Sequence, residues 1–388
     1  MTFSERPHVM LVISSLGAGG AERVITELAA FLAVKGYPVT LVTLEGDRAD
    51  HYSLSPDVRR VRMDIMWESS GFFASIAGML RRLRMIRRMV RAAGADVVIS
   101  FVDMTNIRVL LALAGTRIPV IVSERTDPRR HSIGSVWTRL RRYCYPLAAR
   151  VVVQTEGVAA WARTWLPARK VAIVPNAVRR PSDVADNRPA GLPHGNILMG
   201  MGRLSVEKGF DRLLQAYHDS GLHEKGWFLV ILGEGPERYN LSGLAERLGI
   251  VDRFLLPGLQ VNPDAWLKHA DIFALSSRYE GFPNVLIEAM QCARACVAFA
   301  CDSGPADLVR HGHDGWLVPA DDTAAFADAL RVLTDNPALR IALGEAATDI
   351  SNRLTGDTVY GQWQSICDQV AAQDGKEHVR FKRAGAGE

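Results

Sequence analysis

The sequence is poor in the features that mark several large protein classes. Five of its 388 residues are cysteines, and they do not occur at the paired spacings typical of disulfide-bonded proteins. A disulfide framework is therefore not expected. Cys292 and Cys296 are four residues apart, as two metal ligands could be, but no histidine or second pair completes a zinc site. Aromatic residues make up 7% of the chain, and its basic half lacks the interleaved aromatics or reader motif of a nucleic-acid-binding protein.

Long apolar runs are also lacking near the start of the chain. The first run follows Pro7, and the glycine-rich stretch 17–20 ends it too early for a signal peptide or a membrane span. The sequence therefore predicts neither secretion nor a membrane crossing, and the expected compartment is the cytoplasm.

What is present is enough apolar material for two domains, since 48% of the residues are hydrophobic and 23% are charged. The formal net charge of +4 hides an asymmetry. Residues 1–180 carry 27 Lys and Arg against 14 Asp and Glu, whereas residues 181–388 carry 19 against 28. A basic first half indicates that one lobe meets an anionic surface or ligand.

Short β-branched runs alternate with helical patterns, which is typical of parallel α/β sheets. In the first half the runs are Val9–Ser14, Val39–Leu44, Val97–Ser100, Pro119–Ser123, Val151–Gln154 and Val171–Val174. After the linker "RRPSDVADNRPAGLPHGN" they are Ile197–Met201, Phe228–Leu232, Phe254–Leu256, Ile272–Leu275, Val297–Ala300 and Trp316–Val318. We expect domains at 1–180 and 181–355, a C-terminal helix at 356–375 that crosses back to the first domain, and a flexible tail at 376–388.

The second lobe carries cations and acids in loops that follow strands, where parallel sheets bind ligands. In "GRLSVEKGF", Arg203 follows a strand, and Lys208 stands where Gly209 and Phe210 open a helix, an arrangement suited to a diphosphate. Two solvated surface charges are the plain alternative.

The loop "RYEGFPN" follows the strand "DIFALSS" and leads into an apolar helix. Asn284 is the expected N-cap, which would leave the N–H groups of Val285 and Leu286 facing an anion. Glu288 lies about 6 Å further along the helix axis and leans back toward this end. A carboxylate pairs well with vicinal hydroxyls, so ribose suits Glu288 and a hexose suits Glu280.

The combination of "EGFPNVLIE", "GRLSVEKG" and "GAGGAER" resembles glycosyltransferase family 4, and "VPNAV", "LGEGPE" and "DGWLVP" extend the likeness over nearly the whole chain. The resemblance implies the GT-B fold, two Rossmann-like domains that face each other across a cleft. It is closest to bacterial enzymes that extend lipid-diphosphate-linked oligosaccharides.

The resemblance also implies roles for individual residues. Arg203 and Lys208 would hold the donor diphosphate, Glu288 the ribose, and Glu280 the hydroxyls of the transferred sugar. The remaining donor-binding residues would be Gly19, Gly20, Gly233, Glu234, Leu259, Gly281, Phe282, Asn284, Val285 and Leu286. A UDP-sugar is expected as a substrate, with no metal and no cofactor.

The glycine turn "SLGAGGAERV" permits a second interpretation. In a dinucleotide-binding fold, Gly17 and Gly19 fit the motif and Glu45 could close the second strand, but Glu22 stands where the third glycine belongs. An NAD-dependent oxidoreductase is therefore one alternative. A non-catalytic sugar-nucleotide-binding protein is another.

Acceptor residues are expected in the first lobe. Many members of the resembled family have a histidine after the strand that reads "DVVIS" here, but this chain has Phe101 at that position, with Asp103 nearby as a catalytic candidate or a structural turn carboxylate. The loop "SERTDPRR" offers Ser123, Glu124 and Arg125 to an acceptor pocket.

A basic amphipathic segment supports a lipid-linked acceptor. Phe72, Ile76, Met79, Leu83, Ile86 and Val90 form one helical stripe, and Arg81, Arg84, Arg88 and Arg91 form an adjacent face. Such a helix can lie on an anionic bilayer or bind a lipid diphosphate, although an ordinary surface helix is the alternative.

The sequence thus predicts a metal-independent, retaining glycosyltransferase. It would move GalNAc, GlcNAc or galactose from a UDP-sugar to a polyprenyl-diphosphate-linked or other glycan. The expected location is peripheral, on the cytoplasmic face of the inner membrane.

Overall fold

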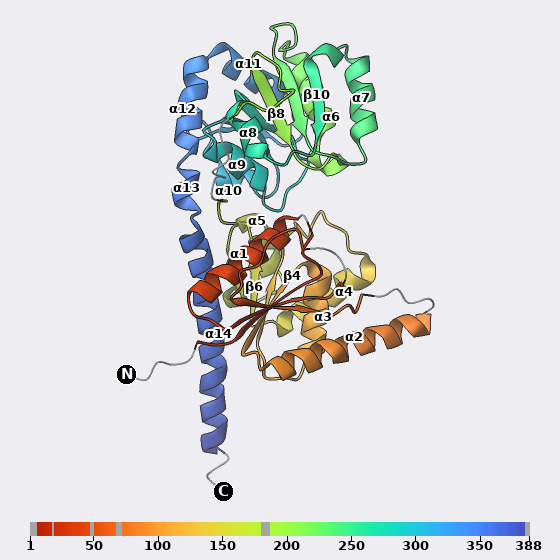
Figure 1. Ribbon diagram of the computed structural model, residues 1–388, viewed down its shortest axis with the longest axis vertical. Coiled ribbons are helices and arrows are strands. Elements are labelled where there is room, and N and C mark those ends of the chain that lie inside the picture. Colours follow the sequence, from red (N-terminus) through yellow and green to blue (C-terminus); the bar gives the residue numbers. More distant parts are fainter. Residues whose placement is uncertain (1–5, 18, 47–49, 67–71, 180–186, 385–388) are drawn as a thin grey trace. The chain divides into compact units, whose positions relative to one another are not determined.

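The computed structural model describes residues 6–17, 19–46, 50–66, 72–179 and 187–384, without the side chains of 72–75 and 374–384. It divides into two compact units, Met1–Ala177 with Gly356–Glu388, and Val178–Thr355. Both are layered α/β structures with a central sheet (Figure 1).

Seven parallel strands form the sheet of the first unit, in the order β3-β2-β1-β4-β5-β6-β7. The strands are β1 Val9–Ile13, β2 Val39–Thr43, β3 Val58–Arg62, β4 Val97–Phe101, β5 Val120–Ser123, β6 Arg150–Val153 and β7 Val171–Ile173. Six of them coincide with predicted runs. The sequence analysis missed β3, because "VRRVR" at the sheet edge has only one buried residue.

Helices cover both faces of this sheet (Figure 1). They are α1 Gly20–Val34, α2 Phe72–Ala93, α3 Asp103–Leu113, α4 Ser135–Cys144, α5 Glu156–Arg163 and α14 Gly356–Ala384, with short 3-10 turns η1 Tyr145–Leu147 and η2 Ala168–Lys170. Met10, Val12 and Val98 face the core under α2 to α5. On the other face, the ring of Phe101 stacks on Trp363 of α14 at 5.6 Å between centroids.

The C-terminal helix belongs to the first unit, although it follows the second unit in the sequence. Tyr360 of α14 contacts Glu27 of α1 through its hydroxyl. The predicted helix ends at residue 375, whereas α14 continues to Ala384, and residues 385–388 lie outside the described chain. Part of the predicted linker, residues 180–186, also lies outside it.

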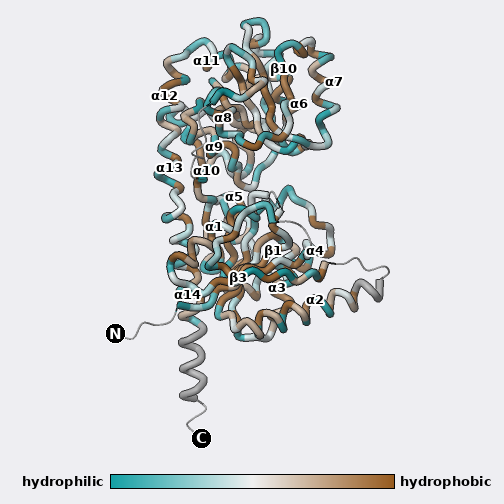
Figure 2. The backbone as a smooth tube through the Cα atoms, in the orientation of Figure 1, coloured by the Kyte–Doolittle hydropathy of each residue, from teal (hydrophilic) through white to brown (hydrophobic). Residues whose placement is uncertain are grey.

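The second unit has a six-stranded parallel sheet in the order β10-β9-β8-β11-β12-β13. The strands are β8 Ile197–Met201, β9 Phe228–Leu232, β10 Phe254–Gly258, β11 Ile272–Leu275, β12 Ala295–Ala300 and β13 Trp316–Pro319. All six coincide with predicted runs. The tube coloured by hydropathy shows these strands as apolar segments between polar loops (Figure 2).

Two apolar cores flank this sheet, one on each face. The helices around them are α6 Phe210–Asp219, α7 Arg238–Arg247, α8 Pro263–Lys268, α9 Asn284–Gln291, α10 Pro305–Leu308, α11 Thr323–Asp335, α12 Pro337–Ala347 and α13 Ile350–Arg353, with 3-10 turns η3 Val206–Lys208 and η4 Val251–Arg253. None of the helices in the described part of the chain is both long and apolar enough to cross a bilayer.

Strand order reverses beside β1 in the first sheet and beside β8 in the second. Open parallel sheets bind ligands at such switch points, outside the carboxyl ends of the strands. The loops that follow β1, β4, β8 and β11 are therefore the positions at which each unit is built to meet a ligand.

Candidate active site

In the second unit the switch point is formed by the loops after β8 and β11. Arg203 is exposed, and its side chain makes no hydrogen bond or ion pair with any other residue in the described ranges. Lys208 ends the η3 turn, and Gly209 takes a left-handed conformation (φ 62°) before α6 begins. The predicted start of a helix at Gly209 and Phe210 is confirmed.

Lys208 and Glu280 form the central contact of this site. The Lys208 Nζ lies 2.8 Å from Glu280 Oε1, which also accepts a hydrogen bond from Ser277 Oγ at 2.6 Å. The Glu280 side chain is 6% exposed and that of Lys208 is 23% exposed. Ser303 Oγ donates to the Glu280 backbone carbonyl at 2.7 Å. The structure therefore brings two of the predicted catalytic residues together and fixes the acid from three directions.

The two loops are also joined through their backbones. Ser276 Oγ donates to the Lys208 carbonyl at 3.0 Å. A Cβ on Gly209 would lie 2.2 Å from the Ser276 carbonyl oxygen, so the close approach requires glycine as well as its positive φ. The loop after β8 and the loop after β11 thus form one rigid support.

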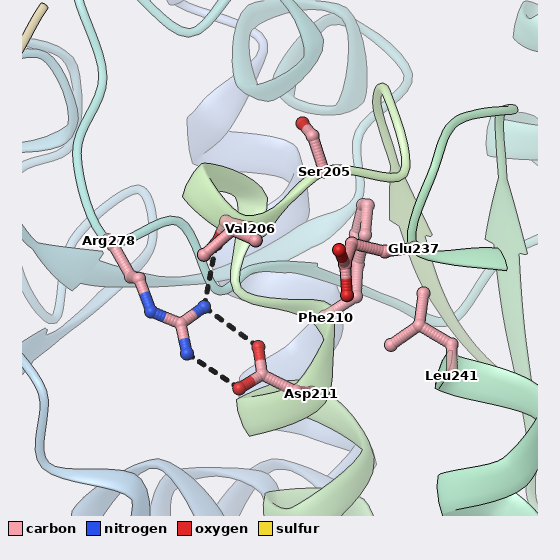
Figure 3. Close-up of a pocket in the computed structure, with 7 residues that line it drawn as sticks. All are labelled: Ser205, Val206, Phe210, Asp211, Glu237, Leu241 and Arg278. Atoms are coloured by element: carbon pink, nitrogen blue, oxygen red, sulfur yellow. Dashed lines mark hydrogen bonds and ion pairs between the residues drawn. The ribbon is translucent and has the colours of Figure 1, made fainter. Parts of the chain in front are cut away.

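Arg278, which the sequence analysis did not single out, completes this support. Its guanidinium forms a bidentate pair with Asp211 of α6 at 2.6 and 2.8 Å and donates to the Val206 carbonyl at 2.7 Å. The pair raises the pKa of Arg278. Figure 3 shows Arg278 and Asp211 among the residues that line a pocket of about 110 Å³.

The start of α9 corrects two predictions. The residue before the helix is Pro283, and Asn284 is its first residue, so no side chain caps this end. The N–H of Leu286 already donates to the Pro283 carbonyl at 3.1 Å and does not face an anion. The physical reason is that Pro283 turns the chain one residue earlier than an asparagine cap would. Phe282 and the Leu286 side chain are buried in a core, which leaves only backbone groups for donor contact.

Glu288 lies in different surroundings from Glu280. It lines a pocket of about 90 Å³ together with residues of α8, the end of α9 and the start of the second unit. The other lining residues are Arg179, Asp264, Lys268, Gln291 and Cys292. Arg179 pairs with Asp264, and Gln291 donates to the Arg179 carbonyl at 2.9 Å. The role of Glu288 as a ribose ligand stays a prediction.

Gly233, Glu234 and Leu259, which the resemblance places near the nucleotide, lie in the loops after β9 and β10. Gly233 has φ 142°, and a Cβ there would lie 1.9 Å from the Gly202 carbonyl oxygen. Glu234 pairs with Arg238 at 2.6 Å, and this hydrogen bond lowers its pKa. Leu259 follows β10 and is 78% exposed. Gly281 follows Glu280 in the loop after β11 and is half-buried.

In the first unit, the glycine turn after β1 contains an acid. Gly19 precedes α1, and Gly20 is the first residue of the helix. The Glu22 carboxylate lies over Gly19, so a Cβ there would be 2.1 Å from Glu22 Oε2. Burial raises the pKa of Glu22. Contact of Gly19 and Gly20 with a donor phosphate stays a prediction.

Ser123 and Glu124 are buried, at 0% and 1% exposure, so their side chains are not offered to an acceptor at the surface in this structure. Burial raises the pKa of Glu124 to about 7. Its Oε1 accepts a hydrogen bond from the Tyr145 hydroxyl and lies 3.2 Å from Arg141 Nε. Glu124 is thus packed against Arg141 of α4 and Tyr145 of η1. Contact of Ser123 and Glu124 with an acceptor stays a prediction.

Arg125 is a cation that the first unit leaves without a carboxylate partner in the described contacts. It donates to Asn176 Oδ1 and to Ser123 Oγ, and its guanidinium lies 5.0 Å from the centre of the Phe101 ring. Burial lowers its pKa to about 10. The Nε has no hydrogen-bond partner. Such a group suits an anionic or hydroxyl-rich ligand, so Arg125 remains an acceptor candidate.

The α2 helix has two distinct faces. Ile86 and Val90 are fully buried in the core, and Arg82 anchors the helix by donating to the Ile65 carbonyl at 2.9 Å. The exposed face begins with Ile76 and Leu80, each 47% exposed. Exposed arginines follow at 81, 84, 88 and 91. The predicted amphipathic helix is present, and its apolar stripe is exposed at Ile76 and buried at Ile86 and Val90, while the side chain of Phe72 lies outside the described residues.

Comparison with known proteins agrees with this geometry. Residues 186–350 match the family model of the glycosyl transferases group 1, and residues 19–177 match that of the glycosyl transferase 4-like domain. Each match falls within one unit of the structure. Together they span most of the chain.

Two curated relatives match over nearly their whole length. A Campylobacter jejuni GalNAc-alpha-(1->4)-GalNAc-alpha-(1->3)-diNAcBac-PP-undecaprenol alpha-1,4-N-acetyl-D-galactosaminyltransferase is 27% identical over 93% of this chain and 98% of its own. The amylovoran biosynthesis glycosyltransferase AmsD of Erwinia amylovora is 24% identical over 92% of this chain and 98% of its own.

Solved structures share the fold. Sucrose-phosphate synthase from Thermosynechococcus elongatus matches with a TM-score of 0.77 at 19% identity, covering 98% of this chain and 100% of its own. Anabaena HepE in complex with UDP and glucose matches with a TM-score of 0.75 at 17% identity, covering 94% and 100%. The predicted GT-B class of two Rossmann-like domains is confirmed. The chain belongs to glycosyltransferase family 4.

Proposed function

We propose that the protein is a retaining glycosyltransferase that moves GalNAc, GlcNAc or galactose from a UDP-sugar to a polyprenyl-diphosphate-linked glycan in bacterial cell-surface glycan synthesis. The observation that carries the proposal is the contact of Lys208 with Glu280 at the switch point of the second unit, with exposed Arg203 in the same loop. The relatives named above support the substrate class.

In this proposal Arg203 and Lys208 bind the donor diphosphate and neutralise the charge that develops on it, without a metal ion or cofactor. Glu280 accepts hydrogen bonds from hydroxyls of the transferred sugar. The bond between the anomeric carbon and the diphosphate breaks, the acceptor oxygen forms the new bond on the same face, and its proton leaves with the diphosphate. Retention is part of the proposal, supported by the resemblance to the family.

The acceptor side of the proposal rests on the first unit. Exposed arginines on α2 supply charge for an anionic bilayer surface or a lipid diphosphate, and exposed Ile76 and Leu80 supply apolar contact at the same helix. A peripheral position on the cytoplasmic face of the inner membrane follows. The name of the Campylobacter relative, which acts on an undecaprenol-linked saccharide, is consistent with such an acceptor.

A donor panel tests the proposal. Purified protein is incubated with UDP-GalNAc, UDP-GlcNAc or UDP-galactose and an undecaprenyl-diphosphate-linked saccharide, and the products are read by mass spectrometry. Addition of one hexose or N-acetylhexosamine, with an α-linkage by NMR, is expected. Arg203→Ala should lose most of the turnover, and its exposed side chain makes misfolding an unlikely cause of such a loss. A β-linked product, or transfer by Arg203→Ala at the wild-type rate, would contradict the proposal.

A further inference from the structure

The switch point of the first unit contains a histidine that the sequence motifs do not reveal. The loop after β4 is short and strained, because Val102, a β-branched residue, has φ 72° and ψ 138°. L-residues of this shape rarely adopt such a backbone, and strain of this kind concentrates at functional sites. The strained residue directs the next one, Asp103, to the start of α3.

Asp103 is itself covered. It is 5% exposed, and its Oδ1 accepts a hydrogen bond from the backbone N–H of Met104 at 2.6 Å. Its Oδ2 lies 3.3 Å from an Arg141 nitrogen and 3.6 Å from His131 Nε2. The His131 side chain is 49% exposed. The group that this edge of the sheet presents to a ligand is therefore the imidazole, and the carboxylate lies beneath it.

The loop after β5 holds His131 at this position. The buried Asp127 accepts hydrogen bonds from the backbone N–H and the guanidinium of Arg129, at 3.0 Å and 2.6 to 3.1 Å. The backbone N–H of His131 donates to the Asp127 carbonyl at 2.9 Å. The turn is thus fixed by its own contacts, so His131 is preorganised before a ligand arrives.

Arg141 sets the charge beneath the imidazole. This arginine is 2% exposed and lies between Asp103 and Glu124. Two acids therefore share one buried cation, and Asp103 Oδ2 is the carboxylate oxygen nearest to His131. An imidazole beside a carboxylate places its N–H toward the acid, which leaves the other ring nitrogen as a hydrogen-bond acceptor. In His131 that nitrogen is Nδ1.

We propose that His131 is an acceptor-recognition residue, whose Nδ1 accepts a hydrogen bond from a non-reacting hydroxyl of the acceptor saccharide, and that Asp103 is its positioning residue. The inference rests on the proposed function and adds a residue to its acceptor side. It reassigns Asp103, expected from the sequence to be catalytic, because a carboxylate covered by Arg141 and His131 supports a neighbouring side chain. In this structure the 3.6 Å between His131 Nε2 and Asp103 Oδ2 is longer than a hydrogen bond, so the proposal requires a neutral ring that moves closer to the acid when the acceptor binds.

The test separates acceptor binding from donor binding. His131→Ala and His131→Gln are compared with the wild type and with His313→Ala, an exposed histidine of the second unit. His131→Ala should raise the acceptor KM about tenfold, the effect of one lost hydrogen bond to a bound ligand. His131→Gln should recover part of the loss, because its amide oxygen can accept the same bond. Binding of UDP by calorimetry and the thermal melting temperature should match those of the wild type in all variants.

Asp103→Asn tests the positioning role. It should raise the acceptor KM in the wild-type background but have little further effect on His131→Ala, since both changes remove one interaction. Independent, additive effects would show that Asp103 does not act through His131 and would overturn its positioning role.

The outcomes distinguish two failures. Wild-type protein that transfers no sugar from any of the three donors removes the proposed function, and with it the acceptor that His131 is proposed to bind. Active wild-type protein with an unchanged acceptor KM in His131→Ala overturns the inference alone. A weaker affinity for UDP in His131→Ala would place the residue in the donor site and would also overturn it.

Discussion

Removing either partner of the Lys208–Glu280 pair should have unequal effects on stability. At 2.8 Å and an effective dielectric constant near 20, the attraction between the charges is about 6 kcal/mol, most of which is offset by desolvation. Lys208→Met leaves a carboxylate that is 6% exposed with one hydroxyl partner from Ser277. Glu280→Gln leaves an ammonium that is 23% exposed and can turn to water.

We therefore expect Lys208→Met to lower the free energy of unfolding by about 3 kcal/mol and Glu280→Gln by about 1 kcal/mol. The double variant should lose about 1.5 kcal/mol less than the sum, because the second change removes a group that the first has already left unpaired. Urea unfolding followed by circular dichroism measures all four proteins. A larger loss in Glu280→Gln than in Lys208→Met, or strict additivity, would refute the reasoning.

The same variants should separate binding from turnover. Glu280→Gln frees Lys208 from a competing carboxylate. The affinity of this variant for UDP should therefore rise about threefold, while its rate of sugar transfer falls by about two orders of magnitude. Lys208→Met should both bind UDP more weakly and transfer sugar more slowly than the wild type. Calorimetry with UDP and a turnover assay check these signs. Weaker UDP binding in Glu280→Gln would show that the acid holds the donor site together more than it competes for the lysine.

Three further predictions concern other parts of the chain. Because burial raises the pKa of Glu124 from 4.5 to about 7, its ionisation destabilises the folded state as pH rises between those values, by up to about 3 kcal/mol. Glu124→Gln should therefore unfold at a higher urea concentration than the wild type at pH 8 but not at pH 4, and equal midpoints at both would contradict this. Changing Arg84, Arg88 and Arg91 to Gln should reduce co-sedimentation with anionic vesicles several-fold at low salt while leaving UDP affinity unchanged; undiminished co-sedimentation would favour a plain surface helix. Gly209→Ala should lose more than 2 kcal/mol of stability in urea unfolding, since its Cβ would meet a carbonyl oxygen at 2.2 Å, whereas Gly36→Ala, with open space around it, should lose less.

The sequence predicts most of the fold because strands buried on both faces read as continuous β-branched runs. Twelve such runs coincide with strands, and only β3 escaped, since its arginines at 59, 60 and 62 interrupt the apolar pattern. An edge strand is paired on one side only, so its sequence carries less of the signal. The same argument explains why the loops after strands were located correctly.

Side-chain partnerships were less predictable than positions. Lys208 and Glu280 are 72 residues apart, and their contact follows from two post-strand loops that meet at one switch point. His131 offered no such clue, since nothing in "SERTDPRRH" indicates that its imidazole returns to cover Asp103. Glu124 looked like a surface acid because its neighbours are polar, yet the packing of α4 over it makes it a buried one.

The return of the C-terminal helix to the first unit affects how the chain matures. Phe101 is complete at an early stage of synthesis, but Trp363, the ring that stacks on it, emerges from the ribosome only after the entire second unit has been made. Until then the part of the first sheet that α14 covers, beside α1, stays exposed. A variant truncated after residue 355 should consequently expose apolar surface on the first unit and aggregate more readily. The second unit needs no such late segment, because it is formed by one continuous stretch of the chain, Val178–Thr355.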